Sequence, residues 1–287
     1  MGTSASSTGP KGGVSLDPPW LNDIALPAPG VVPPPVGQEE EGANPQDAAA
    51  DQPPQPLQVP IQFAPPRRYS NARRKLRDFA TTGNVESFRE AVGHYSRTGM
   101  GGAHRVASRM RTSTKTGASL FGFLQSASAG TDPAINEWVR SLAGRNAGAQ
   151  EVIDVIIQRV APGGGSLDET ACRESMAQAL EDLLELNPTI DLLHLNDGDI
   201  WAIIESFLGY EAFSRLCLDI GQIFENSALS PRDRVTRMNE MQEYLKAELS
   251  AQIEILRNQT PGISTNQLQA VLRSAVQNTF LVYEGAL

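Results

Sequence analysis

The chain has little of what membrane-spanning, secreted and disulfide-bonded proteins are built from. Its 287 residues include only two cysteines and no run of eighteen apolar residues. The first residues show neither the basic segment nor the apolar core of a signal peptide. We therefore expect no transmembrane helix, no secretion and no contact with a membrane, and we interpret Cys172 and Cys217 as reduced core residues of a cytoplasmic protein.

Residue patterns that support catalysis are equally scarce. The chain has three histidines, and they are His94, His104 and His194. No H-E-x-x-H, C-x-x-C or G-x-x-x-x-G-K-[ST] pattern occurs, and the acidic group at 191–199 is explained by helix capping. The sequence predicts no catalytic residue and no metal site, so we expect a protein that is not an enzyme and needs no cofactor.

Proline is almost absent from most of the chain. Fourteen of the 20 prolines fall within residues 1–65, and six are spread over the other 222 residues. The proline-rich part has no periodic apolar pattern, which is typical of an extended linker. We predict a disordered Gly/Ser- and Pro-rich tail over 1–65, whose first 23 residues form a recognition segment, and an α-helical domain over 66–287.

Helical spacing of apolar residues dominates the second part. No alternating pattern longer than four residues competes with it. Expected helix starts lie at Ser70, Asn84, Asp132, Ser166 (with Glu169 as a capping box) and Asp197 or Asp199. The apolar stripe that follows Asp199 runs on through Phe213, Leu216, Leu218 and Phe224. The predicted fold class is all-α, an irregular multi-helix domain of about nine to ten helices without a fixed-period repeat.

The net charge of −9 hides a strong asymmetry. Residues 1–65 carry a net charge of −6, residues 66–115 carry +9 and residues 116–287 carry −12. The basic subregion 66–115 includes a predicted docking patch: Arg67, Arg68, Arg73, Arg74, Lys75, Arg77, Arg105 and Arg109. We favour docking of this patch on an acidic protein surface, including the acidic remainder of this chain. The alternative is contact with nucleic-acid phosphates.

The first thirteen residues, MGTSASSTGPKGG, form an unusually thin terminus. Removal of Met1 would leave the bare amine of Gly2 on a thread of small residues that fits a narrow pocket. The apolar residues Trp20 and Leu21 follow, and they could anchor the thread on a partner. The start also fits the pattern Met-Gly-x-x-x-Ser of N-myristoylation, so a lipid-anchored adaptor is a further alternative.

The start of the chain, MGTSASSTGPKGGVSLDPPWLND, resembles that of the QatB proteins, components of bacterial Qat anti-phage defence systems. The matching residues are Met1, Gly2, Thr3, Ser4, Gly9, Pro10, Gly12, Leu16, Pro18 or Pro19, and Trp20. The resemblance implies a non-enzymatic protein that works with an ATPase, with a protein similar to the deazaguanine synthase QueC, and with a TatD-like DNase.

In related systems, QueC-like proteins attach a deazaguanine-type base to the N-terminal glycine of a partner. The resemblance therefore makes Gly2 the expected modification acceptor. The residues it implies for binding of the QueC-like partner are Thr3, Ser4, Gly9, Pro10, Gly12, Leu16, Pro19, Trp20 and Leu21.

Overall fold

The computed structural model describes residues 67–145, 147–161, 163, 166–225, 228–259 and 265–287. In these ranges the chain forms eleven α-helices, one π-helical segment and no strand, which confirms the all-α class. The elements are α1 (Ser70–Thr82), α2 (Val85–His94), η2 (Tyr95–Met100), α3 (Ala103–Arg109), α4 (Arg111–Ala129), α5 (Pro133–Gly144), α6 (Ala149–Val160), α7 (Leu167–Leu186), α8 (Asp197–Ile220), α9 (Gln222–Glu225), α10 (Pro231–Gln259) and α11 (Thr265–Glu284). The predicted tail over 1–65, with its recognition segment, lies outside the described residues.

Several helix starts follow the capping residues that the sequence predicts. The side chains of Asn84 and Asp132 each accept a hydrogen bond from the backbone N–H two residues on, at 2.9 and 2.8 Å. Ser166 and Glu169 form the reciprocal capping box at the start of α7. These local signals are confirmed because each depends on residues within one turn of the helix start.

Two other helices begin where the sequence predicts, at Ser70 and Asp197, but each is capped by the residue before it. Ser70 is the first residue of α1, and its predicted role as the N-cap was wrong, because Tyr69 takes that position and makes no side-chain capping bond. Helix α8 is capped by Asn196, whose Oδ1 accepts from the N–H of Asp199 at 3.0 Å. The acidic residues of the first turn, Asp197 and Asp199, favour the positive end of the helix dipole without being the cap.

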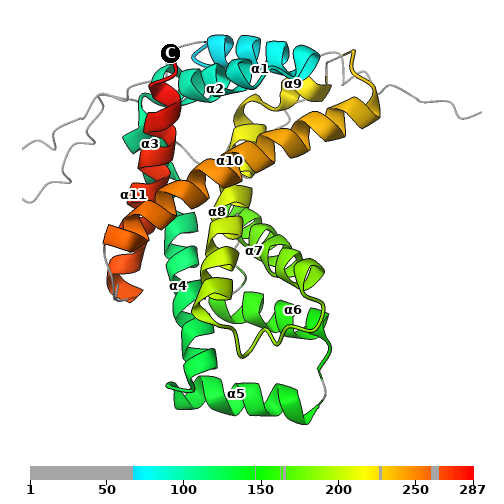
Figure 1. Cartoon of the computed structure of the whole chain (residues 1–287), viewed down its shortest axis with the longest axis vertical. Helices are drawn as coiled ribbons and strands as arrows, with labels where there is room; N and C mark the ends of the chain where they lie inside the picture. The colour runs from blue at the N-terminus through cyan, green and yellow to red at the C-terminus, as the bar shows by residue number, and fades with distance from the viewer. Residues whose placement is uncertain (1–66, 146, 162, 164–165, 226–227, 260–264) are drawn as a thin grey trace, which may run out of the picture. The chain divides into compact units, whose positions relative to one another are not determined.

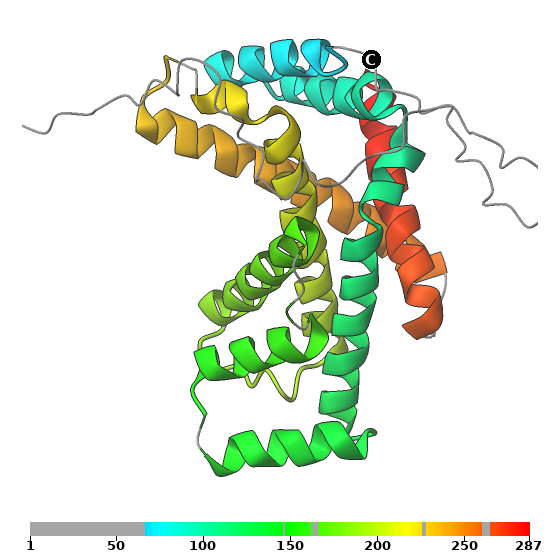
Figure 2. The same ribbon diagram turned by 180° about the vertical axis from the view of Figure 1, so that it is seen from behind.

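Helix α8 contacts α4, α7 and α10, and it runs through the middle of the helical body (residues 67–287) in Figure 1. Helices α1 and α2 lie together at the top of that view, and α5 and α6 lie at the bottom. Figure 2 shows from behind that α4 runs beside α11, which also contacts α2, α3 and α10. None of the helices within the described ranges is long and apolar enough to cross a membrane.

The hydrophobic core is continuous from α1 to α11. Phe88 of α2 lies 5.3 Å from Phe79 of α1 and 5.6 Å from Tyr244 of α10, measured between ring centroids. Helix α2 also lies directly against α11. The two backbones come so close at Gly93 that an added Cβ atom would lie 2.4 Å from the backbone oxygen of Tyr283. The first and last helices of the body are therefore tied into one core.

Candidate functional site

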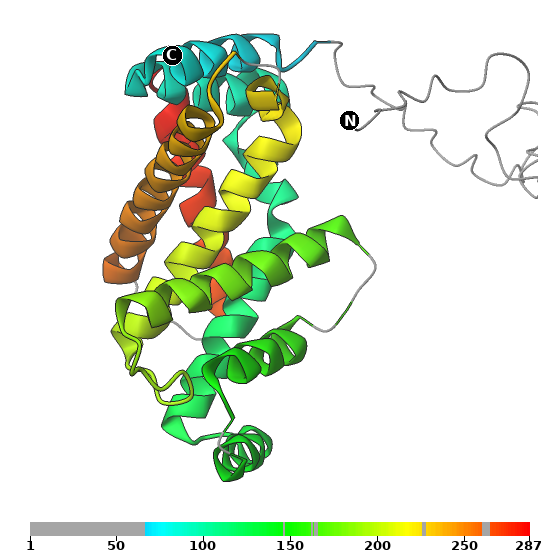
Figure 3. The ribbon, with the colours of Figure 1, turned by 90° about the vertical axis from the view of Figure 1, so that its right-hand side faces the viewer.

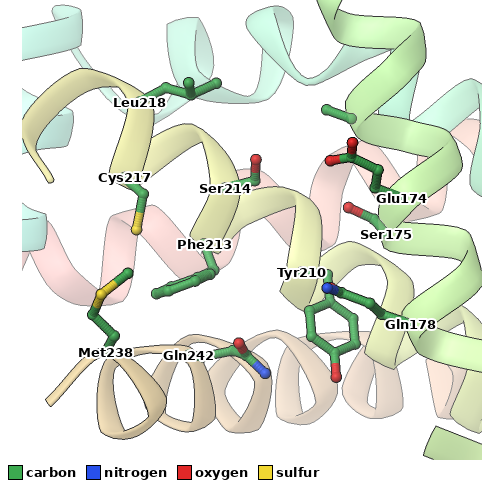
Figure 4. Close-up of a pocket in the computed structure, with 11 residues that line it drawn as sticks. Glu174, Ser175, Gln178, Tyr210, Phe213, Ser214, Cys217, Leu218, Met238 and Gln242 are labelled. Atoms are coloured by element: carbon green, nitrogen blue, oxygen red, sulfur yellow. The ribbon is translucent and has the colours of Figure 1, made fainter. Parts of the chain in front are cut away.

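A groove follows the second half of α8, between α7 and α10 (Figure 4). Its first hollow has a volume of about 360 Å³. Phe213 and Cys217 of α8 and Met238 of α10 form an apolar wall, and Glu174 and Gln178 project from α7 on the other side. Figure 3 shows α7, α8 and α10 from the side.

A second hollow of about 500 Å³ adjoins the first, and both are lined by Cys217, Leu218 and Met238. It is lined further by Arg73 of α1 and Arg234 of α10. The two hollows together are called the α8 groove below. Its α1 end is lined by these two arginines and by the carboxylates of Asp219 and Glu225, and the Nε atom of Arg234 is buried there without a hydrogen-bond partner among the described residues.

Leu218 stands between the two hollows with 72% of its surface exposed. The sequence places Leu218 in the same apolar stripe as Leu216, but the two side chains differ in burial. Leu218 is two residues from the fully buried Leu216, which places it about 200° around the helix at 100° per residue. It therefore points to a side of α8 that no described helix covers.

A polar cluster around Asp182 joins the three helices that form the groove. The carboxylate of Asp182 accepts hydrogen bonds from Ser206 Oγ at 2.7 Å, Tyr210 OH at 2.8 Å and Lys246 Nζ at 2.9 Å. Burial alone would raise the pKa of Asp182, but these hydrogen bonds outweigh it and hold that pKa below its usual value. The cluster stays ionised at neutral pH and fixes α7, α8 and α10 relative to one another.

The side chains that line the α8 groove are suited to binding rather than to catalysis. Burial raises the pKa of the Cys217 thiol to about 12, so the thiol is protonated at neutral pH and is a poor nucleophile. Across the described ranges, no group of three or more His, Cys, Asp or Glu side chains is placed to hold a metal ion. What remains is an apolar surface with charged groups at its ends.

A second polar cluster lies in the interior, around the fully buried Glu211 of α8. Its carboxylate accepts hydrogen bonds from Ser113 Oγ at 2.5 Å, Ser175 Oγ at 2.8 Å and Cys172 Sγ at 3.4 Å. Arg215, one turn further along α8, has its Nη2 atom 4.0 Å from the same carboxylate. This cluster joins α4, α7 and α8 behind the groove.

Asp219, near the end of α8, holds together part of the basic subregion. Its Oδ2 accepts from Arg109 Nη1 and from Tyr95 OH, both at 2.9 Å, and its backbone oxygen accepts from Arg73 Nη2 at 3.0 Å. Tyr69 stacks on Tyr95 with 5.7 Å between ring centroids. Two of the predicted patch residues, Arg73 and Arg109, thus meet at one acidic residue of α8.

The other predicted patch residues do not gather at that point. The guanidinium of Arg68 lies over the Tyr69 ring, 4.6 Å from its centroid, and Lys75 forms an ion pair with Glu90 at 2.5 Å. The remaining four are exposed, and they are Arg67, Arg74, Arg77 and Arg105. Docking of these four on a protein and their contact with nucleic acid both stay predictions.

The expected acceptor Gly2 lies outside the described residues, as do the residues expected to bind the QueC-like partner: Thr3, Ser4, Gly9, Pro10, Gly12, Leu16, Pro19, Trp20 and Leu21. Sequence analysis did not single out Asp182, Glu211 or Asp219. The available signal was that Glu211 lies within an almost wholly apolar stretch of α8, where a charged residue needs partners when it is buried.

Comparison with protein families gives a match to the model of QatB, described as Qat anti-phage system associated protein QatB. The match covers residues 101–283, which include the helices α3 to α10 and most of α11. Comparison with curated proteins and with solved structures gave no match. Because the family match covers more than half of the sequence, the chain belongs to the QatB family of the Qat anti-phage system.

Proposed function

We propose that this chain is the acceptor and assembly subunit of its Qat system. Membership in the QatB family makes it a component of an anti-phage defence system. In our proposal, the N-terminal segment binds the QueC-like component in the cytoplasm, and Gly2 is modified with a deazaguanine-type base after Met1 is removed. The helical body holds further components, for which the ATPase and the TatD-like DNase are the candidates.

The observation that carries the assembly role is the α8 groove. It combines an exposed Leu218 with hollows on both sides of it, and apart from Arg73 of α1 its lining lies within the family match. A large apolar side chain in such a position favours contact with another protein. The raised pKa of the neighbouring Cys217 thiol argues against nucleophilic chemistry at this place.

Mass spectrometry of the N-terminal peptide tests the acceptor role. The chain is expressed with and without the QueC-like component, and the mass of the N-terminal tryptic peptide ending at Lys11 is compared. We expect added mass only when the QueC-like component is present and none with Gly2→Pro, which replaces the primary amine by a secondary one and fixes φ. Gly13→Pro is the matched control, because it leaves the terminal amine unchanged.

An unmodified terminal glycine in the active assembly would contradict the acceptor role. An acyl mass at Gly2 would instead support the lipid-anchored alternative. In the same preparation, Trp20→Ala should weaken binding of the QueC-like component by roughly 2 kcal/mol or more, because a buried tryptophan is a typical interface hot spot. The thermal unfolding of the helical body should not change.

A nucleic-acid-binding adaptor is the second candidate, favoured by the exposed Arg74 and Arg77 on α1. Labelled duplex and single strands are titrated at two salt concentrations. Duplex binding through these arginines would fall on a log–log slope of roughly −0.9 per phosphate neutralised and would vanish with Arg74→Glu and Arg77→Glu. We expect only weak binding, of about 10⁻⁴ to 10⁻⁶ M, because the protein as a whole is acidic.

A further inference from the structure

The α8 groove presents apolar side chains that nothing in the described part of the chain covers. Leu218 is 72% exposed, and it stands between hollows that share Cys217 and Met238 with it. Val235, about one turn before Met238 on α10, lines neither hollow but is also exposed, at 57%. An apolar surface with hollows on both sides is shaped to receive side chains from a partner.

The length of the groove and its surroundings indicate the form of the occupant. Its lining runs from Tyr210 on α8 to Gly221, the C-cap of that helix, which is about 16 Å at 1.5 Å per residue, or three helical turns. The described body has no strand whose edge could pair with an extended peptide. A helix satisfies its own backbone hydrogen bonds and needs no such edge, so a helix suits this groove better than an extended segment does.

The charge at the two ends indicates which helix fits. At the α1 end, Arg73 and Arg234 line the groove, and the Nε atom of Arg234 is buried without a described partner. Of the two acids that line this end, Asp219 already binds Arg109, which leaves Glu225. With Arg109 counted, three arginines meet two carboxylates at this end, a net charge of +1. The first hollow, in contrast, has Glu174 on its rim.

We infer that the α8 groove is the docking site for an acidic amphipathic helix of a partner protein. Its apolar residues lie against Phe213, Leu218 and Met238, and its carboxylates lie at the α1 end, beside Arg73 and Arg234. The inference rests on the proposed assembly role of the helical body and adds to it the chemistry of the segment that binds.

Binding of a synthetic helix to the full-length protein, measured by fluorescence anisotropy, tests the charge preference. The probe is a labelled peptide of about 15 residues with leucines at i, i+4 and i+7 and glutamates at one end. The matched probe has lysines in place of the glutamates. We expect the acidic probe to bind about tenfold more tightly or better, and we expect Arg234→Glu to reverse that order.

Two leucine variants test the place of binding. Leu218→Glu should weaken binding of the acidic probe at least about tenfold, because it puts a carboxylate on the apolar wall. Leu186→Glu is the matched control, since Leu186 is 84% exposed at the end of α7 and does not line the groove. Equal binding by both variants, or equal binding of both probes, would refute the inference.

Photo-cross-linking in the co-expressed Qat components tests the same groove in the assembly. A photoreactive phenylalanine analogue replaces Leu218 in one preparation and Leu186 in the other. We expect position 218 alone to cross-link to a segment of another component that has net negative charge and apolar residues at helical spacing. Cross-links to a second copy or to another segment of this chain would overturn the inference, as would equal yields at the two positions.

The two experiments separate failure of the inference from failure of the proposed function. If the components assemble but position 218 gives no specific cross-link, the groove inference is wrong and the assembly role stands. If no assembly forms at all, the assembly role is wrong, and the peptide titration decides the groove alone.

Discussion

Replacement of the buried Glu211 by glutamine should strongly destabilise the helical body. The substitution keeps the shape of the side chain, but it removes the negative charge and turns one accepting oxygen into a donating NH₂ group. Three groups donate hydrogen bonds to this carboxylate, namely the hydroxyls of Ser113 and Ser175 and the thiol of Cys172, and the new NH₂ group cannot accept from any of them. It also removes a counter-charge from Arg215, which is 5% exposed.

Breaking a buried ion pair by removing one partner typically costs about 3–5 kcal/mol. Two features place Glu211→Gln at the lower end of that range. Arg215 keeps its ion pair with Asp168 at 3.0 Å, and the serine hydroxyls can rotate to accept from the new NH₂ group. We expect a loss of about 3 kcal/mol, which corresponds to a fall in Tm of about 6–12 °C for a domain of this size.

Thermal unfolding followed by circular dichroism measures this loss. Glu185→Gln is the matched control, because Glu185 is exposed on α7 and its substitution should change the free energy of unfolding by no more than about 0.5 kcal/mol. If Glu211→Gln unfolds within 2 °C or so of the wild type, Glu211 is not held as a buried acceptor and the reasoning fails.

Three shorter predictions concern single contacts. Gly93→Ala should lower the free energy of unfolding by about 1–3 kcal/mol, because the new Cβ atom would come 2.4 Å from a backbone oxygen of α11. Gly144→Ala is the control, because a Cβ atom there meets no other atom within 4 Å. Equal Tm values for the two variants would contradict the prediction. Asp182→Asn should lower the free energy of unfolding at pH 7, and the difference from wild type should narrow as pH falls below about 4, since a carboxylate with a lowered pKa loses its contribution as it is protonated. A difference that stays constant down to pH 2 or so would be the opposite result. Iodoacetamide should alkylate Cys217 at pH 8 at least about a hundredfold more slowly than in denaturant, because burial raises its pKa to about 12; equal rates by peptide mass mapping would show that the groove opens.

The sequence predicted those parts of the fold that depend on neighbouring residues. Asn84, Asp132 and the pair Ser166 and Glu169 cap helices because each cap is completed within one turn. The start of α1 at Ser70 was predicted correctly, but its cap was not, because a capping residue type is a preference and here Tyr69 takes the N-cap position without a side-chain bond. The all-α class follows from the spacing of apolar residues in every later segment.

The groove could not be predicted in the same way. Apolar spacing gives the period of α8 but not which of its sides another helix covers, so Leu218 looked like the buried Leu216. The contact of Arg109 with Asp219 joins residues 110 positions apart, and no local pattern indicates it. Charge asymmetry indicated a basic subregion facing an acidic remainder, but it did not show that Arg73 and Arg109 share one partner.

The position of α11 in the core also sets the order of events during synthesis. Helices α2, α3 and α4 all lie against α11, the last helix of the body. A ribosome that adds about 5–20 residues per second needs about 8–30 s to pass from the end of α4 at residue 129 to the end of α11 at residue 284. During that time α2, α3 and α4 have been synthesised, but α11 is not yet available to pack against their apolar faces. The N-terminal segment has been synthesised before all of them. If the N-terminal segment binds the QueC-like component as we propose, that binding can therefore begin before the body has closed.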